Sequence, residues 1–279
     1  MPNTDILLSI VIVSWNSCRQ TVECLESLYI DTLKDPLKNR TEVIVIDNNS
    51  HDNTVKDIQK KFPEIVLIKN QTNKGYAPAC NQGMRIAKGK FTLLLGSDTV
   101  IKQNALRLCV EYLESHFDCG AVGCKLFYTD GSHQGNCKKF PTLRNAFFTY
   151  LSLDKLNYQY DLKWFDYDKT IEVDQIATTF LMIRSDILKE INYFDERFRI
   201  MYNDVDLCRS IWNTGNKIIF LHTAEVFHHG SFSTNRADFK VRKIMYEDIF
   251  LYYYSNYKLK AVFLLPVLAL RLMLVSIFK

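Results

Sequence analysis

The sequence has few glycines and prolines, ten and six respectively among 279 residues. A long low-complexity linker would need more of both, so this composition favours one continuous folded unit. No internal repeat is present at any period. With 47% hydrophobic and 24% charged residues, a chain of this length can bury most of its apolar surface as an ordinary globular protein does.

The chain also lacks an export signal and a zinc-binding cysteine pattern. Residues 1–8 contain neither a basic segment nor a long apolar run, so no signal peptide is predicted. The eight cysteines include no C-x-x-C spacing. Reduced cysteines that act as small hydrophobic side chains in a cytosolic protein are therefore expected, and a disulfide framework in a secreted chain is the alternative.

An excess of one charge is also missing, because the net charge is only +4. From residue 240 onward seven basic and two acidic residues give +5, which leaves −1 for residues 1–239. A nucleic-acid-binding domain usually carries positive charge across its binding face, so no nucleic-acid partner is expected. The segment "SWNSCRQT" also lacks the glycine-rich and basic phosphate loop of a nucleotidyltransferase, the rival enzyme class of similar architecture.

Segments typical of strands and helices alternate through the first 116 residues. Such alternation predicts a parallel sheet with right-handed crossovers, and ligands on such sheets bind beyond the carboxyl ends of the strands. The expected strands are 7–16, 42–47, 65–70 and 90–96, and the expected helices are 18–30, 53–62, 77–89 and 104–116.

Polar side chains follow three of these strands where each one ends. They deliver amide, hydroxyl and carboxylate groups to one edge of the sheet, although turns and helix caps use the same residue types. The three groups are Ser14 to Asn16, Asp47 to Ser50 and Gly96 to Thr99.

The second half of the chain is less regular. Residues 120–128 and 178–185 are predicted strands, 204–215 a helix closed by Gly215, and 217–231 a strand, a turn and a second strand. Because these strands do not alternate with helices, we expect them to join the same sheet in mixed orientation and to border an acceptor cleft.

The stretch "YNDVDL" places Asn203, Asp204 and Asp206 within four positions. Residues two apart on a helix differ by about 200° in direction, so the two carboxylates cannot share one helix face. Only one of them can serve a site on a given side.

Five blocks in this order resemble glycosyltransferase family 2, and within it the bacterial rhamnosyltransferase-like group. The resemblance covers roughly residues 7–235 and implies an α/β GT-A fold, a divalent metal (Mn²⁺ or Mg²⁺) and sugar transfer with inversion. The blocks are "SIVIVSWNS", "VIVIDNNSHDNT", "NKGYAPACNQGMRIAKGKFTLLLGSDT", "FDERFRIMYNDVDLCRSIWNTG" and "NKIIFLHTAEVFHHGSFST".

The resemblance also implies metal ligands. Asp98 matches the last acid of the family's DXD-like motif, but Gly96 and Ser97 stand where further ligands are usual. His228 matches the His of the His-x-Gly pattern, with His229 as the alternate. A divalent cation bridging the diphosphate would neutralise the leaving group's charge.

The same resemblance assigns the base and the nucleotide contacts. Asp204 takes the position of the general base that removes the acceptor's hydroxyl proton, while Asn203 stands where Glu is usual. Asp206 is expected to cap the helix or to pair with Arg209. The implied nucleotide-binding residues are Ser14, Asn16, Asp47, Asn48, Gly75 and Asn81, Asn81 being either structural or directed at the ribose.

A glycosyltransferase domain is expected at 1–239, with a nucleotide-sugar half at about 1–118 and an acceptor half at about 119–239. Residues 240–279 form a basic, aromatic and apolar tail after it. The run 261–278 is interrupted by Pro266, Arg271 and Ser276. As one helix it is slightly short for a ~30 Å hydrocarbon core. An interfacial helix with a belt of tyrosines and lysines is expected, and a helix packed on the body is the alternative.

Together these features predict an inverting, metal-dependent transferase that moves a sugar, plausibly rhamnose from dTDP-rhamnose. The acceptor is a saccharide or a lipid-linked saccharide in surface polysaccharide synthesis, and the enzyme is peripheral on the cytoplasmic face of the membrane. A catalytically silent nucleotide-sugar-binding homologue is the alternative.

Overall fold

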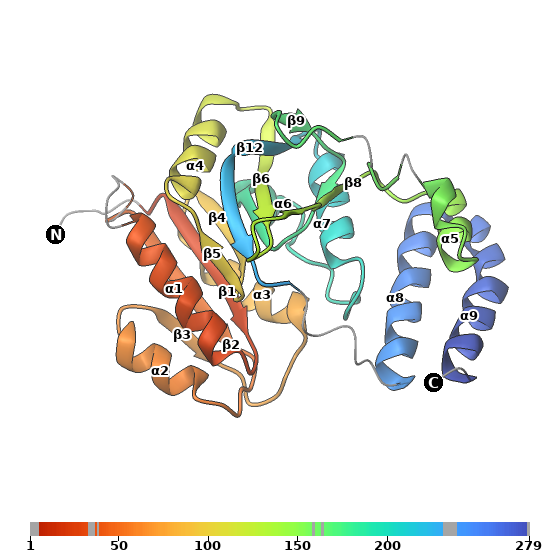
Figure 1. The fold of residues 1–279 in the computed structure, drawn as a ribbon, viewed down its shortest axis with the longest axis horizontal. Helices are drawn as coiled ribbons and strands as arrows, with labels where there is room; N and C mark the ends of the chain where they lie inside the picture. The colour runs from red at the N-terminus through yellow and green to blue at the C-terminus, as the bar shows by residue number, and fades with distance from the viewer. Residues whose placement is uncertain are drawn as a thin grey trace.

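A computed structural model describes residues 6–32, 37, 39–157, 160–162, 165–230 and 239–277. Its first half alternates strands and helices as the sequence predicts, and most bounds agree within a few residues (Figure 1). The elements are β1 (Leu8–Ser14), α1 (Cys18–Thr32), β2 (Thr41–Asp47), α2 (Thr54–Lys61), β3 (Val66–Lys69), α3 (Tyr76–Ile86), β4 (Phe91–Gly96), β5 (Thr99–Ile101) and α4 (Ala105–Ser115).

The second half adds short strands and more helices. Its elements are β6 (Cys119–Phe127), β7 (His133–Gln134), β8 (Cys137–Lys138), α5 (Leu143–Tyr150), the 3₁₀ helix η1 (Asp154–Asn157), β9 (Ile171–Glu172), β10 (Gln175–Ile176), β11 (Phe180–Arg184), α6 (Ser185–Glu190), α7 (Asn203–Asn213), β12 (Lys217–His228), α8 (Phe239–Tyr257), the 3₁₀ helix η2 (Lys258–Leu264) and α9 (Leu265–Ile277).

The main sheet has the strand order β3-β2-β1-β4-β11-β6-β12-β5. Strands β3, β2, β1 and β4 are parallel, β11 is antiparallel to both β4 and β6, and β12 is parallel to β6. The expected mixed orientation of the second half is therefore confirmed. Segment 217–231 differs from the prediction, because β12 is one strand with a register shift between Leu221 and Glu225 rather than a strand, a turn and a strand.

Helices cover both faces of the sheet because its central strands carry apolar side chains at successive positions. Ile10 and Ile12 pack in the core beneath α1, α2 and α4, whereas Val11 packs in the core beneath α3 and α7. All eight cysteines are free thiols and seven are buried, which confirms their predicted role as small hydrophobic side chains. Gly215 has φ +83 just after α7, as predicted for a helix-ending glycine.

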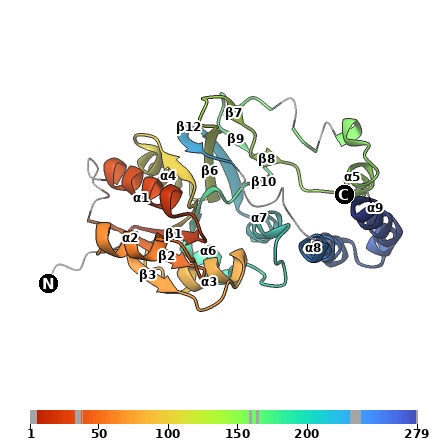
Figure 2. The same cartoon turned by 60° about the horizontal axis from the view of Figure 1, so that its bottom comes forward.

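The C-terminal segment forms a pair of helices, α8 and α9, connected by η2. Figures 1 and 2 show the pair beside α5 and α7, at the end of the molecule farthest from the N-terminus. A third core cluster joins it to the body through Ala146, Phe198 and Val205. Tyr252 and Tyr253 are 0% and 1% exposed in this cluster, so their predicted place in a membrane-facing belt is wrong.

The run predicted as one apolar helix from residue 261 is instead divided between η2 and α9, and Phe278 lies outside the described residues. Among the residues that the structure describes, none of the helices is both long enough and apolar enough to cross a membrane.

Candidate active site

The polar groups predicted at the carboxyl edge of the sheet do meet there. Ser14 and Asp47 are paired in the β1–β2 register, so the loops that follow them start side by side. The backbone N–H of Asn16 donates to Ser50 Oγ (2.9 Å), and the N–H of His51 donates to Asn16 Oδ1 (2.7 Å). These bonds join the loops after β1 and β2 into one rim.

Asp47 carries an unusual carboxylate at this rim. The side chain is 2% exposed, and Oδ2 accepts from the Ser50 N–H at 3.0 Å. Oδ1 is buried and has no hydrogen-bond donor among the described residues. A buried acceptor without a donor is costly, so Asp47 Oδ1 is available to a ligand N–H.

The hydroxyl of Ser14 is committed to the protein. It is fully buried and lies 2.8 Å from Thr21 Oγ1 and 3.0 Å from Ser17 Oγ, which ties the end of β1 to the first turn of α1. The predicted nucleotide contact through this side chain is therefore corrected to a role in shaping the loop.

Asn48 organises the loop before α3. Its Nδ2 donates to Asn73 Oδ1 (2.8 Å) and to the Gly75 carbonyl (3.1 Å). Its Oδ1 accepts from Asn70 Nδ2 (3.1 Å) and from the Lys74 N–H (3.0 Å). Because two donor and two acceptor positions are used internally, the predicted direct contact of this amide with a nucleotide is also corrected.

Asn81 is structural, one of the two roles that its sequence context left open. Its Nδ2 donates to the Phe194 carbonyl (3.0 Å) and to Glu196 Oε1 (2.8 Å), and its Oδ1 accepts from the Phe194 N–H (3.0 Å). Gly75 has φ +86 and ψ 173, a backbone region that essentially only glycine adopts. It sets the turn into α3, close to the carbonyl of Arg199.

Asp98 and His228 face one another at the ends of β4 and β12. His228 Nε2 lies 3.3 Å from Asp98 Oδ2, and both side chains are largely buried. On the other side of the ring, Nδ1 lies 2.9 Å from Gln134 Oε1. The contact with Gln134 fixes the orientation of the ring, so that Nε2 is the nitrogen directed at Asp98.

His229 points to the opposite side of the strand, as expected for adjacent strand residues. Its Nε2 lies 3.4 Å from Glu23 Oε2 on α1, while its backbone N–H donates to the Asp98 carbonyl (3.0 Å). Of the two candidate histidines, His228 is the one that the fold places against Asp98.

This pair fits a divalent cation that arrives with a ligand. An imidazole nitrogen of His228 and a carboxylate oxygen of Asp98 face each other, and Mn²⁺ accepts such a set more readily than Mg²⁺. The described residues contain no group of three or more His, Cys, Asp or Glu side chains able to hold a metal. Phosphate oxygens and water would therefore have to fill the remaining positions of the cation.

Asp204 is the second residue of α7, and the helix begins after Tyr202, which has φ 65. Asp204 Oδ1 accepts from the Val205 N–H at 2.9 Å. Burial raises the pKa of Asp204, while backbone hydrogen bonds and the charge of Lys138 act in the opposite direction. A carboxylate with a raised pKa is a stronger proton acceptor, as a general base requires.

Residues 178–179 connect the surroundings of Asp204 to the Asp98 turn. Burial, and to a smaller extent the charge of Asp204, raises the pKa of Tyr76, whose hydroxyl donates to Thr178 Oγ1 at 3.3 Å. The next carbonyl, that of Thr179, accepts from the Gly96 N–H at 2.9 Å. Two adjacent residues, Thr178 and Thr179, thus contact Tyr76 and the Asp98 turn.

Asp206 lies in a recess whose lining does not include Asp204. Burial and the charge of Asp195 raise its pKa to about 6. It accepts no capping bond at the start of α7, and Arg209 donates to Tyr252 Oη instead (3.0 Å), so both predicted roles of Asp206 are wrong. The recess is lined by Arg85, Ile191, Asn192, Tyr193, Phe194, Asp195, Glu196, Asp206 and Ser210.

Two positioning residues were missed by the sequence reasoning. Gln134 orients His228, yet "GSHQGN" contains no recognisable pattern. Asp248 on α8 is 1% exposed, and its Oδ2 accepts from the backbone N–H groups of Arg199 (3.0 Å), Ile200 (2.7 Å) and Met201 (3.0 Å). Its signal in the sequence was an acid next to the apolar and aromatic run "IFLYYY", which the sequence analysis assigned to the tail.

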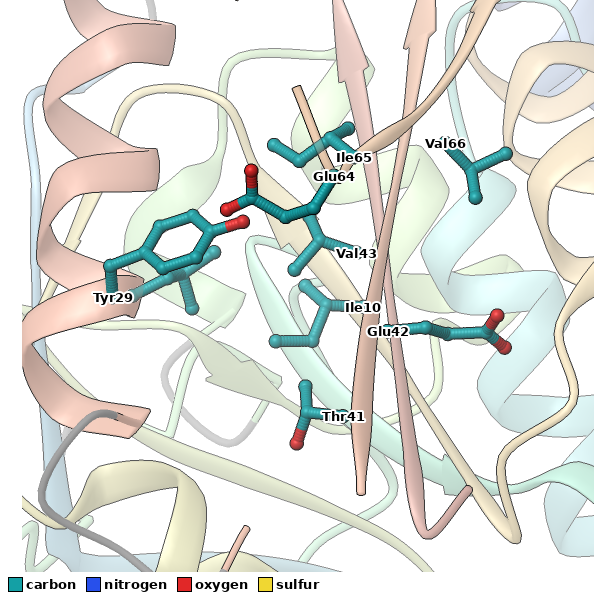
Figure 3. A pocket seen from close by; sticks show the side chains of 9 residues that line it. Ile10, Tyr29, Thr41, Glu42, Val43, Glu64, Ile65 and Val66 are labelled. Atoms are coloured by element: carbon teal, nitrogen blue, oxygen red, sulfur yellow. The ribbon is translucent and has the colours of Figure 1, made fainter. Parts of the chain in front are cut away.

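A further pocket lies away from these residues, near the amino ends of β2 and β3 (Figure 3). Figure 3 shows the Tyr29 hydroxyl directed toward the Glu64 carboxylate across it. Burial and the hydrogen bond with Glu64 raise the pKa of Tyr29. The pocket brings no candidate catalytic group to the carboxyl edge of the sheet. Its lining consists of Ile10, Leu28, Tyr29, Thr41, Glu42, Val43, Glu64, Ile65 and Val66.

Residues 9–192 match the sequence pattern of Glycosyl transferase family 2. The chain belongs to this family. Over 237 residues it is 24% identical to glycosyltransferase GlyG of Streptococcus pneumoniae, a match that covers 84% of this chain and 74% of that protein. It is 32% identical over 119 residues to chondroitin synthase of Escherichia coli, covering 42% of this chain and only 16% of the synthase.

Solved structures show the same fold. TarS of S. aureus (residues 1–349), determined in complex with UDP-GlcNAc, aligns with a TM-score of 0.59 and 20% identity, covering 88% of this chain and 66% of that one. GalNAc-T7, determined with UDP, GalNAc and Mn²⁺, aligns with a TM-score of 0.58 and 16% identity, covering 82% and 44%. The predicted GT-A fold, a mostly parallel sheet flanked by helices, is confirmed.

Proposed function

We propose that this glycosyltransferase is inverting and uses a divalent cation to transfer a sugar from a pyrimidine nucleoside diphosphate. The observation that carries the proposal is the pairing of Asp98 with His228 at the carboxyl edge that also holds the unpaired oxygen of Asp47. This edge is where ligands bind in open α/β sheets.

Asp47 would read the nucleobase. The imide N–H of a pyrimidine is a donor, and Asp47 Oδ1 is a buried acceptor without one at this edge of the sheet. Uracil and thymine share this N–H, so both UDP-sugars and dTDP-rhamnose are candidate donors. TarS has been determined with UDP-GlcNAc, which supports including that donor.

Asp98 and His228 would hold the cation, Mn²⁺ or Mg²⁺, that accompanies the diphosphate. When bound, such a cation neutralises the charge that develops on the leaving diphosphate. Gln134 holds the His228 ring through Nδ1 and so directs Nε2 toward Asp98.

Asp204 would act as the base. Its carboxylate takes the proton of the acceptor hydroxyl while that oxygen bonds to the anomeric carbon and the bond to the diphosphate breaks on the opposite side. One displacement of this kind inverts the anomeric centre. A saccharide or lipid-linked saccharide in surface polysaccharide synthesis is the proposed acceptor, which would place the enzyme on the inner face of the membrane.

Hydrolysis of UDP-GlcNAc, UDP-galactose and dTDP-rhamnose, measured with and without Mn²⁺, tests the proposal. Calorimetric titration with UDP and Mn²⁺ should show tight binding that Asp98→Ala abolishes. Asp118→Ala is the matched control, because Asp118 is an exposed acid at the opposite end of the sheet, paired with Lys217. UDP binding without turnover of any donor would favour the alternative, a catalytically silent binding homologue. Equal Mn²⁺-dependent affinity in both variants would refute the metal site.

A further inference from the structure

One face of the helix pair α8–α9 is packed against the body of the protein. Ala261, Leu264 and Leu268 are 0–4% exposed and pack with Tyr252 and Tyr253 in the third core cluster. This face attaches the pair to α5 through Ala146 and to α7 through Val205.

The other face carries large apolar side chains in water. Leu259 and Phe263 are 77% and 73% exposed, far above the level of a core residue. Isolated exposed apolar residues are normal on soluble proteins, but a contiguous group marks an interaction site. The further exposed members in the same segment are Val262, Leu265, Leu270 and Met273. We call the group from Leu259 to Met273 the apolar face.

The apolar face continues onto the segment after α5. Arg271 Nη1 donates to Ser152 Oγ (2.9 Å), which holds α9 against residues 151–156. Leu151, Leu153 and Leu156 in this segment are 45–56% exposed. Figure 2 shows α5 lying directly against α9.

Positive charge lies at one end of the apolar face. Lys258 and Lys260 are exposed on either side of Leu259. No acidic residue follows Asp248 in the sequence, and the only acid in the adjoining segment 151–156, Asp154, is next to Lys155. Apolar side chains flanked by lysines match the boundary between acyl chains and anionic headgroups.

We propose that the apolar face docks on the surface of an anionic lipid bilayer and lies in its interface. No described helix can span the membrane, which leaves the interface as the place where this face can bury. Pairing with a second copy is disfavoured, because residues 259–273 of the copy contain no acid to pair with Lys258 and Lys260, whereas anionic headgroups provide one. The inference rests on the proposed function only in that a lipid-linked acceptor gives the docking a purpose.

Flotation of the full chain with vesicles tests the docking without any sugar donor. The vesicles contain phosphatidylcholine alone or phosphatidylcholine with phosphatidylglycerol, at low and high salt. The wild-type chain should float with the anionic vesicles. The double variant Leu259→Ser/Phe263→Ser should lose about tenfold or more in partitioning at either salt concentration, because the lost burial is apolar.

The double variant Lys258→Gln/Lys260→Gln should lose about tenfold or more at low salt only, because that share is screened. Phe117→Ser is the matched control, since Phe117 is 80% exposed on the α4–β6 connection, and it should float like the wild-type chain. Wild-type protein that stays in the aqueous fraction, or a Leu259→Ser/Phe263→Ser variant that floats unchanged, would overturn the proposal.

Light scattering on the same samples tests whether the apolar face pairs with a second copy of the chain. A dimer that Leu259→Ser/Phe263→Ser dissociates, together with absence of flotation, would overturn lipid docking in favour of self-association. Donor hydrolysis by the wild-type chain separates this proposal from the previous one. A wild-type chain that hydrolyses a donor but does not float contradicts only the docking, and one that floats without turning over any donor contradicts only the enzymatic function.

Discussion

Asp248 offers the sharpest test of how the C-terminal helices support the active site. Its Oδ2 accepts three consecutive backbone N–H groups, those of Arg199, Ile200 and Met201, immediately before α7. In Asp248→Ala these donors lose their common acceptor. Each unsatisfied buried donor costs about 1–3 kcal/mol, although water entering the space of the removed carboxylate recovers part of this. We expect a net loss of about 3–5 kcal/mol, as for removal of one partner from a buried charged contact.

Glu247→Ala is the matched control on the same helix. Glu247 forms ion pairs with Arg199 and Lys243, but its side chain is 47% exposed, so its loss should cost about 1 kcal/mol or less. Urea unfolding of the two variants and the wild-type chain gives the comparison directly. Asp248→Asn, which keeps one oxygen acceptor, should fall between the two alanine variants.

The same substitution should impair transfer more than donor binding. The segment 199–201 leads through Tyr202 into α7, where Asp204 is placed. Its release should raise amide hydrogen exchange across residues 199–205 and lower kcat for sugar transfer, while the affinity for UDP with Mn²⁺ stays within about twofold. If Asp248→Ala is as stable as Glu247→Ala, or leaves exchange in this segment unchanged, the positioning role is refuted.

Three further predictions concern individual carboxylates. Asp204→Asn should retain UDP binding but lose transfer. In the wild-type enzyme, the acidic limb of the pH–rate profile should lie above the ordinary carboxyl pKa of about 4, because burial raises the pKa of Asp204. A profile that stays flat down to pH 4 would contradict this. Asp206→Asn should stabilise the fold by about 1–2 kcal/mol at pH 8 and by little at pH 4. The pKa of Asp206 in the folded state, about 6, lies above its unfolded value, so the ionised carboxylate lowers the stability of the wild-type fold increasingly from about pH 4 to 6 and fully above that. Urea unfolding of the variant and the wild-type chain at the two pH values measures this difference. A variant that is less stable than the wild-type chain at pH 8 would contradict the prediction. Asp47→Asn should weaken UDP binding about tenfold and leave the binding of Mn²⁺ with inorganic pyrophosphate unchanged. Equal losses for both ligands would show that Asp47 does not bind the nucleobase.

The C-terminal segment shows that composition alone does not decide which side chains of a segment are buried. Residues 240–279 are basic, aromatic and apolar, and their sequence alone was compatible with either an interfacial helix or a packed one. Tyr252 and Tyr253 are buried in the body, whereas Leu259 and Phe263 are exposed. One face of the segment is therefore packed on the body and the other is exposed, while the docking of that exposed face on a membrane and the division of the chain at residue 239 stay predictions.

The sequence by itself determined the alternation of strands and helices in the first half of the chain, because apolar periodicity and turn residues act over short distances. It also predicted that Asp47 and Asp98 lie at the carboxyl edge, since parallel strands bring their ends together whatever the details of packing. The separation of Asp204 from Asp206 followed from helix geometry alone.

Only the tertiary structure decided which polar groups remain available to a ligand. Asn48 and Asn81 have the residue types of ligand contacts, but their amides are occupied by backbone groups from loops that the chain brings together over long sequence separations. Gln134 and Asp248 acquired positioning roles in the same way, through partners 94 and 47–49 residues away. Hydrogen bonding is short-ranged and directional, so such partners are fixed only when packing has set the distances between the elements.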